Sequence, residues 1–248
     1  MAPRPKCLLW LTAMSCLAAG GCPSMALYQD RPLEIRWRAA VPLKNLEQLK
    51  TLDALLDRPP AGVDAGAKLT LVKADNPDVV AVVTTGKEYL AFKRLGYVFK
   101  TPADNLLEST FKAATLPLAL LAKALPARTS YLQDFSLSRE GVASLPASLG
   151  LAGEEGNPAD ARKDRRWGEA FPGSAVQVVD ADTIVISDEQ AQTRLTVLAF
   201  ADFDHDGIED VLLCVANSSR TRSLKLFRYV VLTRKGEGET LLVVRDDS

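Results

Sequence analysis

The sequence predicts an α+β fold, in which an N-terminal mixed helix and strand part is followed by an antiparallel β-meander. Leucines recur at helical spacing between Leu46 and Leu56, and a capped helix start follows at Thr101. After residue 174 the chain contains only short apolar runs, with no segment of helix length between them. Strands joined by such short connections pair antiparallel, which favours a meander over parallel crossover units.

The overall composition is that of an ordinary globular protein. Of the 248 residues, 47% are apolar and 25% are charged, and the formal net charge is −1. This near balance gives no reason to expect nucleic acid as a partner.

The first 21 residues are typical of a secretory leader. Arg4 and Lys6 are followed by an apolar run and then by small residues, which is the order of a signal peptide. The apolar run is shorter than the ~20 residues that a spanning helix needs. The segment Leu17-Ala-Ala-Gly-Gly-Cys22 resembles the bacterial lipobox, in which small residues precede a cysteine that receives diacylglycerol. The resemblance implies cleavage before Cys22 and a lipid anchor on that cysteine.

An ordinary signal peptidase site, with Cys22 incidental, is the alternative to this lipoprotein interpretation. In the lipoprotein interpretation residues 22–30 form a tether, and Pro23 in place of an aspartate favours the outer membrane over the inner one. Cys214 is then the only other cysteine of the mature chain, so no internal disulfide forms.

Residues 31–150 are expected to form the α+β part. Its predicted elements are a strand with Leu33, Ile35 and Trp37 on one face, a helix over 46–56, strands over 68–73 and 79–84, a strand or strand pair over 89–99, and a helix from Thr101 that Pro117 kinks or ends.

Residues 151–173 are expected to be a solvated linker or loop, because glycine, proline and charged residues dominate them. The part from 174 to 248 is expected to be the antiparallel β part. Its predicted strands are 175–179, 183–186, 194–201, 211–216, 224–233 and 240–244.

The loop over residues 202–210, Asp-Phe-Asp-His-Asp-Gly-Ile-Glu-Asp, carries the one specific chemical feature. Carboxylates gathered in one loop repel one another unless a cation lies among them. Calcium suits such a loop, because it accepts six to eight oxygen ligands in irregular geometry, and Gly207 permits the chain to reverse sharply. An EF-hand is excluded, because its twelfth position needs a glutamate and here is Leu213.

The stretch from Leu198 to Leu213 resembles the calcium loop of FG-GAP/VCBS repeats, which are strand–loop–strand units. The resemblance implies four side-chain ligands and one backbone carbonyl ligand. These are Asp202, Asp204, Asp206 and Asp210, with the carbonyl of Ile208. It covers a single copy, so it does not imply a propeller. The alternative is an acidic hairpin turn without a bound ion.

The sequence lacks the residues that several classes of enzyme need. His205 is the only histidine, so a histidine-rich zinc site is excluded, and no nucleophile elbow, phosphate-binding loop or dinucleotide fingerprint is present. The sequence therefore favours a non-catalytic binding or scaffolding lipoprotein of the envelope, with a structural calcium site. Its partners would be the membrane, through the anchor, and an unidentified envelope protein or glycan. The alternative is a cell-envelope hydrolase that uses carboxylates dispersed in the sequence.

Overall fold

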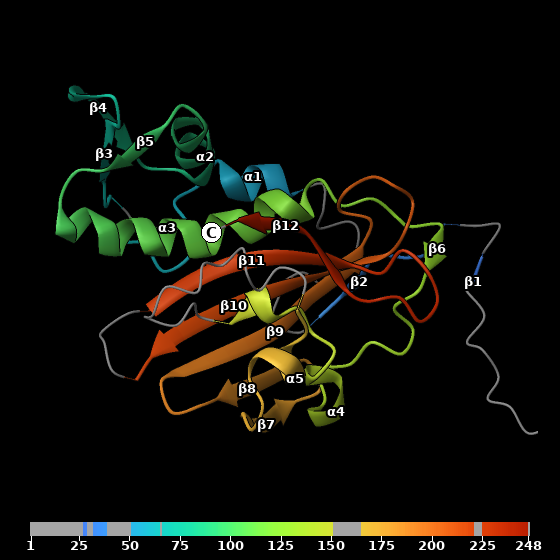
Figure 1. Ribbon diagram of the computed structural model, residues 1–248. Coiled ribbons are helices and arrows are strands. Elements are labelled where there is room, and N and C mark those ends of the chain that lie inside the picture. The colour runs from blue at the N-terminus through green and yellow to red at the C-terminus, as the bar shows by residue number, and fades with distance from the viewer. Residues whose placement is uncertain are drawn as a thin grey trace, which may run out of the picture.

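The computed structural model describes residues 27–28, 32–38, 51–64, 66–150, 165–220 and 225–247 (Figure 1). The predicted leader, Cys22 and residues 46–50 of the first predicted helix lie outside the described residues. No helix among the described residues is long and apolar enough to cross a membrane.

A seven-stranded antiparallel sheet forms the centre of the molecule and confirms the predicted meander (Figure 1). Six strands follow one another in chain order from β7 to β12, and the short strand β2 (Arg36–Trp37) pairs with the end of β9. The six are β7 (Ala175–Asp180), β8 (Thr183–Ser187), β9 (Ala191–Ala201), β10 (Asp210–Ser219), β11 (Lys225–Thr233) and β12 (Leu242–Asp247).

Helix α3 (Pro102–Leu121) begins as the sequence predicts, with a capping box between Thr101 and Asp104. It continues through Pro117, whose missing N–H leaves the carbonyl of Ala113 without its usual partner in the helix. The hydroxyl of Tyr229 on β11 donates to that carbonyl at 2.6 Å. The proline is therefore accommodated because the sheet supplies the hydrogen bond that the helix lacks.

A smaller sheet of order β4-β3-β5 lies beside the N-terminal part of α3 (Figure 1). Its elements are β3 (Leu69–Lys73), β4 (Asn76–Val83) and β5 (Tyr97–Phe99), with α2 (Gly86–Arg94) between β4 and β5. The prediction of strand over 89–99 is thus wrong for most of its length. A capping box between Thr85 and Glu88 starts a helix there, and Tyr89 is buried against Phe111 of α3.

Both faces of the large sheet are covered (Figure 1). On one face, Leu52 of α1 (Leu52–Leu56) and Leu121 of α3 pack against β9, β10 and β11. On the other face, the segment 132–149 packs with Trp167 against the same strands. This segment contains α4 (Arg139–Val142) and η2 (Ala147–Leu149), and Trp167 begins α5 (Trp167–Ala170). The parts 31–150 and 174–248 therefore share two hydrophobic cores, whereas a third, around Leu71 and Phe111, lies within 31–150.

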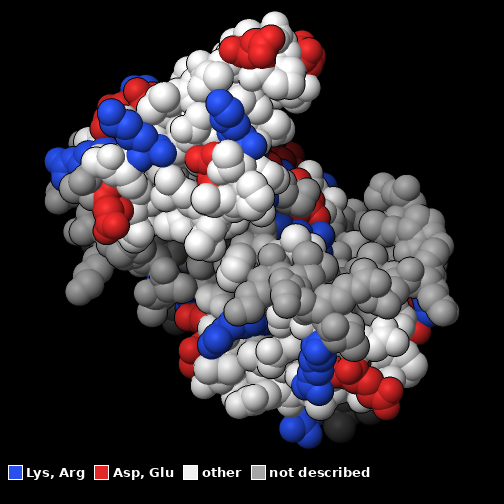
Figure 2. Space-filling view, turned by 90° about the vertical axis from the view of Figure 1, so that its left-hand side faces the viewer, with Lys and Arg blue, Asp and Glu red and all other residues white. Residues whose placement is uncertain are grey.

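Two segments predicted as connections contain a short helix or strand near one end. The predicted linker 151–173 contains α5, whose Trp167 is buried in the core, while Pro172 and Gly173 at the end of the segment are exposed. The predicted tether 22–30 contains β1 (Leu27–Tyr28), which pairs with β6 (Thr129–Ser130). On the face drawn in Figure 2, basic and acidic side chains are interspersed.

Candidate metal site

The acidic loop connects β9 to β10, two neighbouring strands of the large sheet. Asp210 pairs with Ala201 across these strands, so Asp202 and Asp210 stand at the two ends of the loop. Both terminal aspartates are buried, with Asp202 3% and Asp210 0% exposed.

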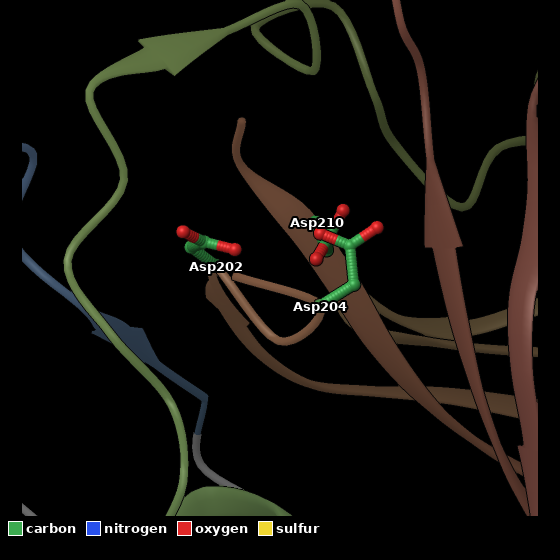
Figure 3. Close-up of side chains that lie close together, drawn as sticks. All are labelled: Asp202, Asp204 and Asp210. Carbon is green, nitrogen blue, oxygen red and sulfur yellow. The ribbon is translucent and has the colours of Figure 1, made fainter. Parts of the chain in front are cut away.

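Three of the predicted ligands converge. Asp202, Asp204 and Asp210 each offer one carboxylate oxygen, and these three oxygens lie within 4.8 Å of one another (Figure 3). Such a spacing allows all three to reach one cation at the 2.3–2.6 Å typical of calcium ligands. The convergence therefore fits a metal ion, without fixing which metal binds.

Asp202 also folds the loop. Its carboxylate accepts backbone N–H groups of His205 at 2.7 Å, Asp206 at 3.2 Å and Gly207 at 2.9 Å. The chain turns with positive φ at His205 (67°) and Gly207 (86°), a conformation that glycine adopts without strain. Because a carboxylate oxygen has further lone pairs, these bonds leave Asp202 able to bind a cation.

Asp210 supplies the strongest structural sign that this loop could hold a cation. One of its oxygens, Oδ2, accepts the N–H of Phe203 at 2.8 Å, while the buried Oδ1 has no hydrogen-bond donor among the described residues. The pKa of Asp210 is raised to about 6, mainly by burial, and the charges of Asp204 and Asp206 act in the same direction. The nearby Thr233 hydroxyl and the N–H of Phe203 act against this rise in pKa. Neither the Thr233 oxygen nor Oδ1 of Asp210 has a partner in hydrogen-bonding geometry within the described structure.

A buried carboxylate oxygen without a donor is costly unless a cation or a proton compensates it. The possible metal ligands that converge at Asp210 are carboxylate oxygens, which calcium and other hard cations prefer. The residues present therefore fit a metal ion at this position.

The side chain of Asp206, a fourth predicted ligand, is not part of this group. Oδ2 of Asp206 forms an ion pair with Lys235, and its Oδ1 accepts the N–H of Ile208 at 2.8 Å. Although partial burial acts against it, the hydrogen bond from Lys235 lowers the pKa of Asp206. Ile208 forms a β-bridge with Thr129. The roles of Asp206 and the Ile208 carbonyl as ligands stay predictions.

Glu209 has a different role, which the sequence did not reveal. Its buried carboxylate accepts two hydrogen bonds from Arg36, at 3.2 and 2.8 Å, and one from the Ser130 hydroxyl at 2.6 Å. The Arg36 guanidinium also stacks 4.2 Å from the centre of the Phe200 ring. Glu209 therefore joins β2, β6 and the loop, and it is fully engaged within the protein.

The segment 125–130 holds the loop from the other side. Leu125 and Asp202 exchange two backbone hydrogen bonds, and the carbonyl of Gly207 accepts the N–H of Arg128 at 2.8 Å. His205 contacts this region as well, because its Nε2 lies 2.8 Å from the carbonyl of Lys123. The loop is thus fixed on two sides before any ion binds.

A separate polar groove of about 320 Å³ lies beside α4 and the connection from β11 to β12. Asp134 and Glu140 are the two carboxylates that line it, with Arg234 opposite. Arg234 donates to Asp134 at 2.6 Å and to the carbonyl of Tyr131 at 2.9 Å. The residues that line this groove include none from the acidic loop.

Comparisons of the chain with protein-family models, with curated proteins and with solved structures found no match.

Proposed function

We propose that this protein is an envelope lipoprotein whose large sheet carries one structural calcium ion in the β9–β10 loop. The observation that carries the proposal is the convergence of one carboxylate oxygen each from Asp202, Asp204 and the fully buried Asp210, which also keeps one oxygen without a donor among the described residues. The ion would balance these charges and fix the end of two core strands.

Calcium is the best candidate among the common protein metals. The cluster offers only carboxylate oxygens, and the single histidine is turned to the Lys123 carbonyl. Zinc and copper sites usually include histidine or cysteine, which this cluster lacks. Magnesium needs a tight octahedron and keeps several waters, whereas calcium accepts the irregular spacing of a loop.

A lipid on Cys22 would hold the calcium loop close to a membrane. Cys22 lies five residues before Leu27, and β1 pairs Leu27 with Ser130, whose hydroxyl bonds to Glu209 of the loop. Five extended residues reach at most about 18 Å. Such an anchor supports a binding or scaffolding role at a membrane surface, with an envelope protein or glycan as partner. The outer membrane is our proposed location, from Pro23 after the anchor.

Calcium titration calorimetry on the chain without its leader tests the metal site. We expect one ion per chain, with a dissociation constant of about 10⁻⁴–10⁻³ M, as in extracellular calcium modules. Asp210→Asn should abolish binding, because it removes the buried charge and keeps the shape of the side chain. The matched control is Asp188→Asn in the β8–β9 connection, where Asp188 also accepts backbone N–H groups. Binding that survives Asp210→Asn unchanged would refute the site.

The anchor is tested separately in cells. Cys22→Ala should abolish lipid modification and leave the protein unprocessed or soluble. Mass spectrometry of the mature wild-type N-terminus is the direct measurement, and an unacylated N-terminus would refute the lipoprotein proposal.

The hydrolase alternative has one observation in its favour, the groove that Asp134 and Glu140 line. Hydrolysis of a glycosidic bond uses two carboxyl groups on either side of the bond. A panel of envelope glycans should be turned over by the wild type and by neither Asp134→Asn nor Glu140→Gln, if this alternative holds. We rank it second because Asp134 is paired with Arg234 and its side chain is 66% exposed.

A further inference from the structure

Lys235, which lies outside the acidic loop in the sequence, places its positive charge beside two of the loop's carboxylates. Its ammonium group pairs with Asp206 and lies 3.4 Å from Oδ2 of Asp204. Asp204 is also one of the three converging carboxylates. The same ligand therefore faces both the proposed ion and the lysine.

Two successive residues fix the start of the β11–β12 connection in two directions. Arg234 holds the segment at Tyr131 and Asp134, whereas Lys235 holds the acidic loop. Beyond them the connection contains Gly236 and Gly238, and one backbone hydrogen bond joins Glu239 to Gly236 at 3.3 Å. The lysine contact is thus the link between the acidic loop and this connection.

The ammonium group and a divalent ion compete for the same negative charge. Lysine supplies one positive charge at hydrogen-bond distance, while calcium supplies two at about 2.4 Å and so attracts each carboxylate more strongly. Once an ion neutralises Asp204, Lys235 keeps only its pair with Asp206, and the ion competes for that carboxylate as well. Asp206 is then released from the lysine and becomes available to the ion as a fourth carboxylate.

We propose that Lys235 is a built-in competitor of calcium, which the ion displaces from Asp204 and Asp206, so that metal binding frees the β11–β12 connection. This inference rests on the proposed calcium site. It makes Lys235 the residue that sets the calcium concentration at which the loop fills. It also makes residues 235–240 the segment that changes with metal occupancy.

Calcium titrations of the wild type and Lys235→Met at one fixed ionic strength test the competition. We expect Lys235→Met to bind calcium about two- to fivefold more tightly, since an exposed ion pair is worth up to about 1 kcal/mol and 1.4 kcal/mol is tenfold in affinity. Lys235→Arg keeps the charge and should bind like the wild type. Lys123→Met is the matched control, because it removes a lysine near the loop that forms no ion pair with it in the described structure; its affinity should stay within about twofold.

Hydrogen exchange supplies the second readout. In the wild type, calcium should speed amide exchange in 235–240, and in Lys235→Met exchange there should be fast with or without calcium. Equal affinities of wild type and Lys235→Met would overturn the competition and leave the calcium site standing. Weaker binding by Lys235→Met would also overturn it, because the lysine would then support the ligands. No binding by any variant would refute the calcium site itself.

Discussion

The large sheet has two aspartate-rich connections that behave differently. In the β7–β8 turn, Asp180 accepts the N–H of Asp182 at 2.9 Å, and Asp182 pairs with Arg38 at 3.3 Å. Each carboxylate there has its own partner within the protein. In the β9–β10 loop, three carboxylates converge and the buried Asp210 keeps one oxygen without a donor. The two connections therefore differ in the burial of their carboxylates and in a carboxylate oxygen without a donor, and of the two the β9–β10 loop brings three carboxylates close enough to hold a metal ion.

The largest difference between the two connections should come from Glu209. Glu209→Ala leaves Arg36 and Ser130 without their shared acceptor, and we expect a loss of about 3 kcal/mol in the free energy of unfolding, at the lower end for a buried pair because Arg36 is half exposed. Asp182→Asn breaks only a partly exposed pair at 3.3 Å and should cost less than about 1 kcal/mol.

Urea denaturation in chelator measures both changes without a contribution from metal. If Glu209→Ala does not fold, Glu209→Gln keeps the shape and removes the charge, and it should still cost more than Asp182→Asn. Equal losses of unfolding free energy in the two connections would contradict the role of Glu209 in joining β2, β6 and the loop.

Calcium should distinguish the connections next. At a calcium concentration ten times the dissociation constant, binding contributes about 1.4 kcal/mol, which raises Tm by about 3–6 °C for a chain of this size. A chelator should reverse the shift, and magnesium should replace calcium poorly. Differential scanning calorimetry measures the effect.

Asp206→Ala should remove most of this calcium shift, because the ion loses the carboxylate that Lys235 releases. In chelator the variant should melt close to the wild type, since the lost ion pair and the relieved repulsion offset each other. A full calcium shift in Asp206→Ala would show that Asp206 is not a ligand.

A smaller effect should come from the backbone of the loop. Gly207 has φ of 86° and open space where a Cβ would lie, so Gly207→Ala is opposed only by its conformation and should cost about 1 kcal/mol. Gly207→Asn should cost less, because asparagine tolerates this region better. Chemical denaturation compares the two, and identical stability of Gly207→Ala and wild type would argue against a strained turn.

The smallest effect is expected in the β8–β9 connection. Asp188→Asn retains the acceptor oxygen that bonds to Gln190 and Ala191. We expect its stability to change by less than about 0.5 kcal/mol, with an unchanged calcium shift in the same calorimetric scans. A lost shift would mean that calcium binds to exposed turn acids in general.

Local patterns predicted much of this fold. Apolar runs and turn residues located the six meander strands, and Thr101, Pro102 and Asp104 marked the start of α3. The misread segment after Tyr89 had a usable local signal, because Thr85 and Glu88 form a capping box; its aromatic residues favoured a strand instead.

Long-range partners could not be predicted from those patterns. Arg36 and Glu209 are 173 residues apart, and nothing near either residue indicates the other. Lys235 likewise reaches the acidic loop only because β10 and β11 are neighbours in the sheet. Spacing within the loop identified Asp202, Asp204 and Asp210, which converge, but it could not show that a lysine already engages Asp206.

In our proposal, Asp202, Asp204 and Asp210 hold one calcium ion. A crystal grown in calcium, with anomalous scattering recorded, tests it most directly. We predict a single anomalous peak about 2.3–2.6 Å from a carboxylate oxygen of each of the three, with Lys235 moved away from Asp204. Absence of the peak at a calcium concentration well above 10⁻³ M, with Lys235 still paired to Asp204 and Asp206, would contradict the account.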